Sequence, residues 1–133
     1  MKFFIAQRVT GEDMIKLKEE SIKIVRSLKK AGHEAYCTML EDVEEFNKKS
    51  KREIMKHAFN EINNSDAIFV VVRREDKSEG LLMEVGYTFG KKKKIILAIN
   101  SDVKNTYIRD IADEVIEFKN TDDLINKISK IRI

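Results

Sequence analysis

Cysteine and histidine are scarce in this sequence, which has one cysteine and two histidines among 133 residues. A single cysteine excludes an internal disulfide framework and any cysteine-based zinc site. Two histidines are too few for a histidine-rich metal site. We therefore expect no metal site in this protein.

Long apolar segments are also missing. The first residues hold a short apolar run that ends at Gln7, whereas a secretory signal needs about 7–15 consecutive apolar residues. No stretch approaches the roughly 18 apolar residues that a membrane-spanning helix requires. We therefore predict a cytoplasmic protein that does not act at a membrane.

Neither sign of charge predominates. The sequence has 26 Lys and Arg against 23 Asp and Glu, a formal net charge of +3. This balance lacks the basic surplus that is typical of proteins that bind nucleic acids or anionic membranes. Apolar residues make up 42% of the chain, which excludes global disorder. The length favours one domain over residues 1–133.

Segments typical of strands and of helices alternate along the chain. Strands are expected at 3–7, 34–39, 67–72, 95–99 and 115–118, and helices at 12–30, 51–62, 80–90, 106–112 and after 120. Such alternation requires parallel strands joined by helical crossovers. It predicts an α/β three-layer sandwich of the flavodoxin or Rossmann type, with about five strands.

Local signals mark several helix ends. Ser50 and Glu53 have the spacing of a capping box. Gly32 is expected to end the first long helix in a left-handed conformation. Thr10 is expected to cap the start of that helix. The segment 40–49 is expected to be a loop.

Three segments are expected at the carboxyl edge of the sheet, namely 7–12, 73–80 and 100–106. Ligands bind at this edge in open parallel sheets, close to the point where the strand order reverses. Arg73 and Arg74 follow the third strand. They either contact a ligand or lie in a solvated loop.

The segment from Ser78 to Gly80 leads into a predicted helix. The free backbone N–H groups of a helix start attract anions. Ser78 adds a hydroxyl, and Gly80 allows a ligand to approach the backbone closely. The pattern therefore indicates either a phosphate or carboxylate site or an ordinary helix capped by Ser78.

Glu84 is an acidic residue on a helix whose other residues predict an apolar face. That face is expected to contain Leu81, Leu82, Val85 and Phe89. Buried carboxylates are rare unless they are paired or functional. Glu84 therefore lies either at the mouth of a pocket or at the edge of the apolar face.

These residues resemble the nucleoside 2-deoxyribosyltransferase superfamily, which includes 2′-deoxynucleoside 5′-monophosphate N-glycosidases. Residues 83–88, Met-Glu-Val-Gly-Tyr-Thr, are similar to the family's Met-Glu-Leu-Gly-Tyr-Ala stretch. Ser78 and Gly80 precede Glu84 by six and four residues, as the corresponding residues precede the nucleophile in the N-glycosidases. Residues 64–71 and 1–6 also resemble strand segments of the family.

The resemblance implies a retaining mechanism in which Glu84 attacks the anomeric carbon and forms a glycosyl ester. Water or a second base then completes hydrolysis or transfer. Ser78, Gly80 and Arg8 are implied to bind a 5′-phosphate, together with the turn at Thr10 and Gly11. Thr10 is either such a ligand or only a helix cap.

The resemblance also implies a homodimer or a larger homo-oligomer, in which a position near Asn105 contacts the neighbouring subunit. It requires no cofactor. A flavin-binding protein of the same fold needs a loop rich in Ser, Thr and Gly after the first strand, and Thr10 and Gly11 alone are too few. The expected partner is a small nucleoside or nucleotide.

The sequence departs from the family at several positions. Phe4 stands where many members have a tyrosine that contacts the nucleophile, and Ala58 stands where active members have an aspartate. Arg8 and Thr10 occupy the Ser and Arg positions of the N-glycosidase loop. His57 either replaces the missing acid or is a surface residue. These departures leave open a second hypothesis, a sensor that binds nucleotides without turnover.

Overall fold

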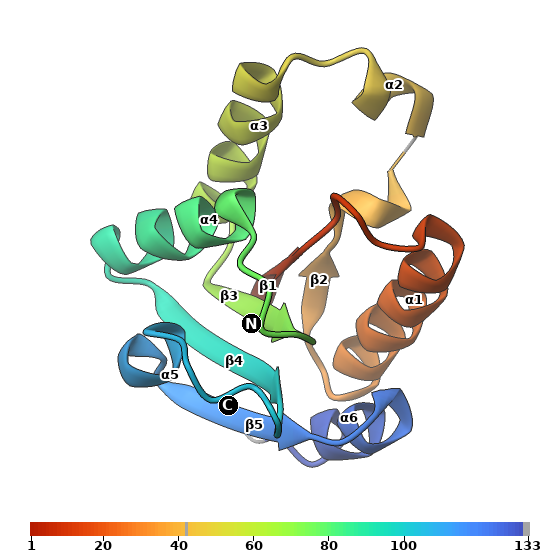
Figure 1. Cartoon of the computed structure of the whole chain (residues 1–133), viewed down its shortest axis with the longest axis vertical. Helices are drawn as coiled ribbons and strands as arrows, with labels where there is room; N and C mark the ends of the chain where they lie inside the picture. The colour runs from red at the N-terminus through yellow and green to blue at the C-terminus, as the bar shows by residue number, and fades with distance from the viewer. Residues whose placement is uncertain (42, 132–133) are drawn as a thin grey trace.

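The computed structural model of the chain, described for residues 1–41 and 43–131, is built on one sheet of five parallel strands. The strand order is β2-β1-β3-β4-β5 (Figure 1). The strands are β1 (Lys2–Gln7), β2 (Glu34–Tyr36), β3 (Ala67–Val72), β4 (Lys94–Asn100) and β5 (Glu114–Phe118). The predicted α/β sandwich is confirmed, and the order is that of flavodoxin-like folds.

Helices cover both faces of the sheet. Those of the described residues are α1 (Met14–Lys30), η1 (Thr38–Leu40), α2 (Val43–Asn47), α3 (Lys51–Asn63), α4 (Glu79–Gly90), α5 (Ile108–Ile111) and α6 (Thr121–Ile128). One apolar cluster joins the sheet to α1 and α6, and a second joins it to α3, α4 and α5. None of the described helices has the length and apolar character needed to cross a membrane.

Side-chain alternation along β1 shows how the two clusters form. Phe3 and Ile5 belong to the cluster on the α1 side, whereas Phe4 and Ala6 belong to the cluster on the α3 and α4 side. Successive side chains of a strand point to opposite faces. The unbroken apolar run of β3 follows from the same rule, since this strand is covered on both faces.

The predicted ends of three helices are confirmed. Ser50 accepts a hydrogen bond from the backbone N–H of Glu53, and the Glu53 carboxylate returns one to Ser50. Gly32 follows α1 with φ of 92°. Ser78 caps α4 through a bond from the backbone N–H of Leu81.

The segment between β2 and α3 differs from the prediction. The second strand ends at Tyr36 rather than at residue 39, because the chain turns into η1. The predicted loop 40–49 contains the helix α2, and position 42 lies outside the described residues. An acidic segment such as 41–45 is compatible with the start of a short helix, where carboxylates face the positive end of the helix dipole.

Two further expectations were wrong. Asp13, not Thr10, caps α1, because its carboxylate accepts hydrogen bonds from the backbone N–H groups of Ile15 and Lys16. Leu82 and Phe89 of α4 are 42% and 55% exposed, so they do not lie on its core face. Thr88 is fully buried there instead, and its hydroxyl donates to the backbone carbonyl of Glu84.

Gly32 provides a test of the backbone account. We expect Gly32→Ala to lower the free energy of unfolding by about 1 kcal/mol, because a side chain disfavours the left-handed conformation. A Cβ at Gly32 would meet no atom within 4 Å, so the loss comes from the backbone alone. Gly90→Ala, in a helix and without a positive φ, is the control and is expected not to destabilise. Urea unfolding measures both, and equal effects would contradict the account.

Candidate functional site

The three segments expected at the carboxyl edge lie together. The Arg74 guanidinium is 2.5 Å from the Glu12 carboxylate, which joins the loop after β3 to the loop after β1. On the other side, the Glu75 carboxylate accepts a hydrogen bond of 3.1 Å from the backbone N–H of Lys104, and Lys77 donates to the backbone carbonyl of Asn105. The loop 73–78 is therefore fastened to both of its neighbours.

Arg8 directs its guanidinium into a small pocket at this edge. Its Nε donates to the backbone carbonyl of Thr10 at 3.0 Å, and its Nη1 lies 3.5 Å from a carboxylate oxygen of Asp76. Nη1 is buried and has no hydrogen-bond partner among the described residues. The pocket is also lined by Ser78, so the structure brings together two of the expected anion ligands.

Gly11 and Gly80 leave room around this pocket. Gly11 has φ of 82°, and a Cβ there would lie 3.3 Å from Nη2 of Arg8. Glycine therefore allows the Arg8 side chain to fold over the turn. At Gly80, in the first turn of α4, an added Cβ would meet nothing within 4 Å. A ligand can approach the backbone at this helix start.

Arg73 and Arg74 are both paired with carboxylates, but only Arg73 is largely withdrawn from solvent, whereas the Arg74 side chain is 49% exposed. Nε of Arg73 lies 2.8 Å from the Glu20 carboxylate of α1, and both side chains are largely buried. Nη2 of Arg73 is buried without a hydrogen-bond partner in the described part of the chain. Arg73 thus places a second unsatisfied donor at the pocket of Arg8.

Glu84 lies on the side of α4 that faces α3. Tyr87, three residues later, is on the same side of the helix. Its ring stacks on Phe59 of α3 with centroids 4.3 Å apart, and its hydroxyl donates to Oδ1 of Asn63 at 2.9 Å.

The Glu84 carboxylate is partly buried, and no described residue donates a hydrogen bond to it or pairs with it. Burial raises its pKa to about 8 from the ordinary value of 4.5. An unpartnered carboxylate with a strongly raised pKa is typical of functional sites.

Phe4 and Ala58 form the apolar layer beside Glu84. Both are buried, at 1% and 6% exposure, and both belong to the cluster that contains Leu81 and Val85 of α4. The phenyl ring of Phe4 has no hydroxyl and Ala58 ends at a methyl group, so neither donates a proton to Glu84.

Tyr36, Glu41 and His57 form a hydrogen-bonded cluster on the other side of this layer. The Tyr36 hydroxyl donates to the Glu41 carboxylate and lies 2.8 Å from Nε2 of His57, which is 3.3 Å from the same carboxylate. Burial and the bond to Glu41 raise the pKa of Tyr36, so its hydroxyl stays neutral. The sequence analysis considered His57 but missed its partners, because the turn through η1 that brings Glu41 close was not predicted.

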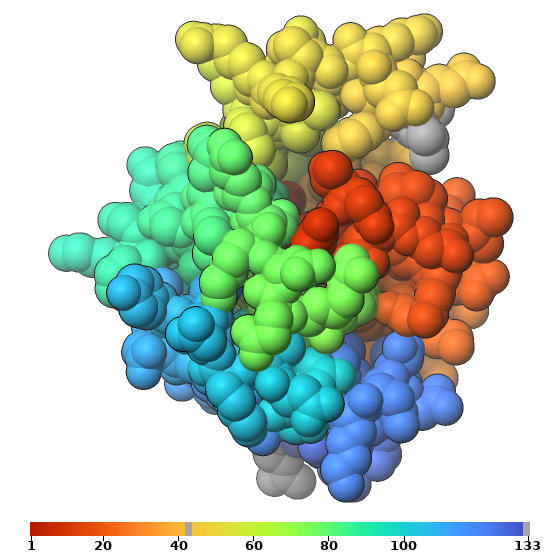
Figure 2. Space-filling model, in the orientation of Figure 1, coloured from red at the N-terminus to blue at the C-terminus, as the bar shows by residue number. Residues whose placement is uncertain are grey.

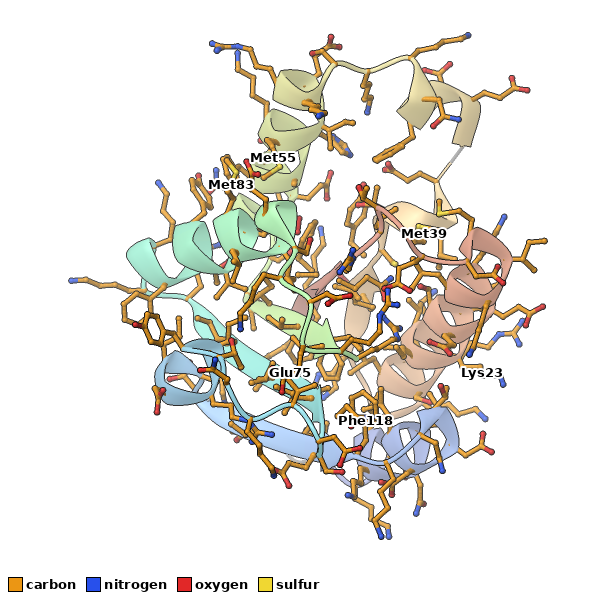
Figure 3. The ribbon with its side chains drawn as sticks, viewed as in Figure 1. Lys23, Met39, Met55, Glu75, Met83 and Phe118 are labelled. Carbon is orange, nitrogen blue, oxygen red and sulfur yellow. The ribbon has the colours of Figure 1, made fainter. Side chains whose placement is uncertain are left out.

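The surface is hollowed in this region. Figure 2 shows a depression between the α2–α3 segment (yellow), α4 (green) and the loop after β1 (red). In Figure 3 the labels of Met55 on α3 and Met83 on α4 lie close together, whereas Met39 of η1 lies apart and belongs to the buried cluster on the α1 side. No group of three or more His, Cys, Asp or Glu side chains within the described ranges could hold a metal ion.

The environment of Glu84 leads to a prediction about stability. The folded state holds a proton on Glu84 up to about pH 8, whereas the unfolded chain loses it near 4.5. Folding stability therefore falls as pH rises through this window. Glu84→Gln has no carboxyl group to ionise and therefore avoids this loss. The free energy of unfolding of the variant should rise relative to that of the native protein by up to about 1.4 kcal/mol per pH unit. Urea unfolding at pH 5, 6.5 and 8 measures this gain.

Glu79→Gln is the matched control, since Glu79 lies exposed in the first turn of the same helix. The difference in the free energy of unfolding between Glu79→Gln and the native protein is expected to change far less with pH. A gain for Glu84→Gln that stays constant between pH 5 and 8 would contradict the burial of its carboxylate.

Comparisons with known proteins agree with the fold. The structure is similar to the CMP N-glycosidase BcmB of Clostridium botulinum, with a TM-score of 0.74 and 17% identity over 98% of this chain and 100% of that one. It is also similar to a 2-deoxyribosyltransferase of Bacillus psychrosaccharolyticus, with a TM-score of 0.67 and 20% sequence identity. That alignment covers 95% of this chain and 91% of the other. A flavodoxin-like domain from Synechococcus has a TM-score of 0.53 and 14% sequence identity to this chain. The alignment covers 96% of this chain and 91% of that domain.

A comparison with curated protein sequences finds no match. The sequence profile of the family described as nucleoside 2-deoxyribosyltransferase matches residues 10–124, most of the chain. The matched segment contains Ser78, Gly80 and Glu84. The family resemblance noted in these residues is therefore confirmed, and the chain belongs to the nucleoside 2-deoxyribosyltransferase family.

Proposed function

We propose that this protein cleaves the N-glycosidic bond of a nucleoside or a nucleoside 5′-monophosphate, with Glu84 as the nucleophile. The observation that carries the proposal is the position of Glu84. It is a partly buried carboxylate without a partner among the described residues, on the α3 side of a helix that starts at the carboxyl edge of the sheet. Membership of the family supports the reaction class.

The chemistry proceeds in two steps. The ionised Glu84 carboxylate attacks the anomeric carbon, so that the bond to the base breaks and a glycosyl ester forms. Water then releases the free sugar, or a second base takes the sugar. Only the ionised carboxylate attacks. Because burial raises the pKa of Glu84 to about 8, the rate is expected to rise with pH up to that value.

The pocket of Arg8 and Ser78 is suited to a 5′-phosphate. Arg8 and Arg73 each have a buried guanidinium nitrogen without a hydrogen-bond partner among the described residues, which could serve as a charge-assisted donor. The nitrogen of Arg8 forms an ion pair of 3.5 Å with Asp76, which a phosphate would have to replace. The α4 start at Gly80 adds free backbone N–H groups and the positive end of a helix dipole. Binding energy at this remote phosphate would position the sugar against Glu84. Thr10 contributes its backbone, through the bond from Arg8, rather than a helix cap.

Assembly is a further part of the proposal. Asn105 lies exposed beyond β4, next to the pocket, and its backbone carbonyl accepts from Lys77. In a homodimer or larger homo-oligomer, Asn105 would meet the neighbouring subunit beside the site. Sedimentation of the native chain reports the assembly, and a monomer would contradict this part.

A second candidate function is a sensor that binds a nucleotide without turnover. Phe4 and Ala58 favour it, because neither offers a proton to the site. Binding without product distinguishes this sensor from the enzyme. The two functions share the anion pocket and differ in the fate of the glycosidic bond.

The proposed reaction is tested by measuring base release from a panel of ribo- and deoxynucleosides and their 5′-monophosphates by chromatography. We expect release from at least one of them, and a loss of at least about 1,000-fold in Glu84→Gln, since an amide cannot serve as the nucleophile. Glu79→Gln, in the same helix, should retain activity. Release that survives in Glu84→Gln would exclude the nucleophile, whereas tight binding without release would support the sensor.

Arg8 allows a test of the phosphate site. Arg8→Gln is expected to weaken the binding of a nucleoside 5′-monophosphate by about 10- to 100-fold, the value of one charge-assisted hydrogen bond. The binding of the matching nucleoside should hardly change. Arg26→Gln, at an exposed position of α1, is the control. Calorimetric titration that finds equal losses for nucleoside and nucleotide would contradict a phosphate site at Arg8.

A further inference from the structure

The cluster of Tyr36, Glu41 and His57 has no role in the function proposed so far. Its members come from the end of β2, the end of η1 and the outer side of α3. Nε2 of His57 lies within hydrogen-bond or ion-pair distance of the Tyr36 hydroxyl and the Glu41 carboxylate, and the Tyr36 hydroxyl donates to that carboxylate. The His57 and Glu41 side chains are each about a third exposed, so a ligand can reach them.

The cluster and Glu84 border the same apolar layer from opposite sides. The Tyr36 ring stacks on Phe4, with centroids 5.8 Å apart and an angle of 19°. Phe4 also belongs to the cluster of buried residues that includes Leu81 and Val85, which flank Glu84 on α4. The stack of Tyr36 on Phe4 therefore connects the Tyr36, Glu41 and His57 cluster to the apolar layer that packs against α4 beside Glu84.

Successive side chains of α3 turn to different neighbours. Phe59 points to α4, where it stacks on Tyr87, and His57 points to Tyr36. Ala58, between them in sequence, faces the sheet and contributes only a methyl group. A single methyl group therefore fills the position on α3 between His57 and Phe59.

The departing base needs a proton, because a heterocyclic anion is a poor leaving group at neutral pH. Of the residues around this layer, Phe4 and Ala58 have none to give. We propose that His57, positioned by Tyr36 and Glu41, is the general acid that protonates the leaving base. This inference rests on the proposed cleavage reaction and adds to it the group that the reaction otherwise lacks.

The step balances as follows. The Glu84 carboxylate oxygen bonds to the anomeric carbon while the bond from that carbon to the base nitrogen breaks, and the electron pair stays on the base. The base takes the proton from Nε2 of the His57 imidazolium, replacing the Tyr36 and Glu41 oxygens near that nitrogen. The Glu41 carboxylate, 3.3 Å from Nε2, holds the ring in place before transfer. In hydrolysis, the attacking water returns a proton to His57 and the ester bond to Glu84 breaks.

Leaving-group chemistry tests this role. The variants are His57→Gln and, as the matched control, His33→Gln. His33 is the only other histidine and lies at the opposite edge of the sheet, against the amino-terminal nitrogen and Phe3. Each is assayed with the best nucleoside or nucleotide substrate and with the 4-nitrophenyl glycoside of the same sugar, whose phenolate leaves without a proton.

We expect His57→Gln to lower kcat for the natural substrate by about 100-fold or more, the usual contribution of a general acid. For the nitrophenyl glycoside the loss should stay below about fivefold. Tyr36→Phe retains the ring stack on Phe4. Its kcat should also fall more for the natural substrate than for the nitrophenyl glycoside, but by less than in His57→Gln. His33→Gln should match the native protein with both substrates.

The outcomes separate this inference from the proposed function. Equal losses for both substrates, or no loss, in His57→Gln would overturn the acid role while the native protein's cleavage of the natural substrate still supports the function. If the native protein cleaves neither compound, the proposed function fails and the acid role fails with it. Circular dichroism of each variant shows whether α3 is intact.

Discussion

The parallel alignment of the five strands is the constraint on which the rest of the structure depends. Parallel strands direct all their carboxyl ends to one edge, and each connection must return the chain across a face of the sheet. The loops after β1, β3 and β4 therefore meet, although they are separated by more than sixty residues in the case of Glu12 and Arg74. The same rule places the start of α4, and with it Ser78 and Glu84, at the proposed site.

The site is stabilised less well than the scaffold that holds it. β3 and the centre of β4 are buried on both faces in apolar surroundings. The Glu84 carboxyl, in contrast, is partly buried without a partner, and Arg8 and Arg73 each have a buried nitrogen without an acceptor. Unpaired polar groups of this kind reduce stability. The scaffold tolerates them, as expected where groups are kept ready for a ligand rather than for folding.

Much of the fold could be predicted from the sequence, because its signals are local. The apolar run 67–72, the Ser50 capping box and the glycine at position 32 each act within a few residues. The second strand, the α2 segment and the cap at Thr10 were predicted wrongly, since competing local patterns there are resolved by packing. For the site, the spacing of Ser78, Gly80 and Glu84 pointed to α4, the helix on which the proposed site is built. The pairing of Arg73 with Glu20, and of His57 with Glu41 and Tyr36, depends on tertiary contacts that no local pattern encodes.

The central claim is that Glu84 forms a covalent bond to the sugar. The most direct test is intact-protein mass spectrometry after rapid acid quenching of the native protein with its substrate, followed by peptide mapping. The account predicts a mass increase equal to one sugar or sugar phosphate residue, located on the peptide that contains Glu84. Base release without any such adduct, or with the adduct on another residue, would contradict it.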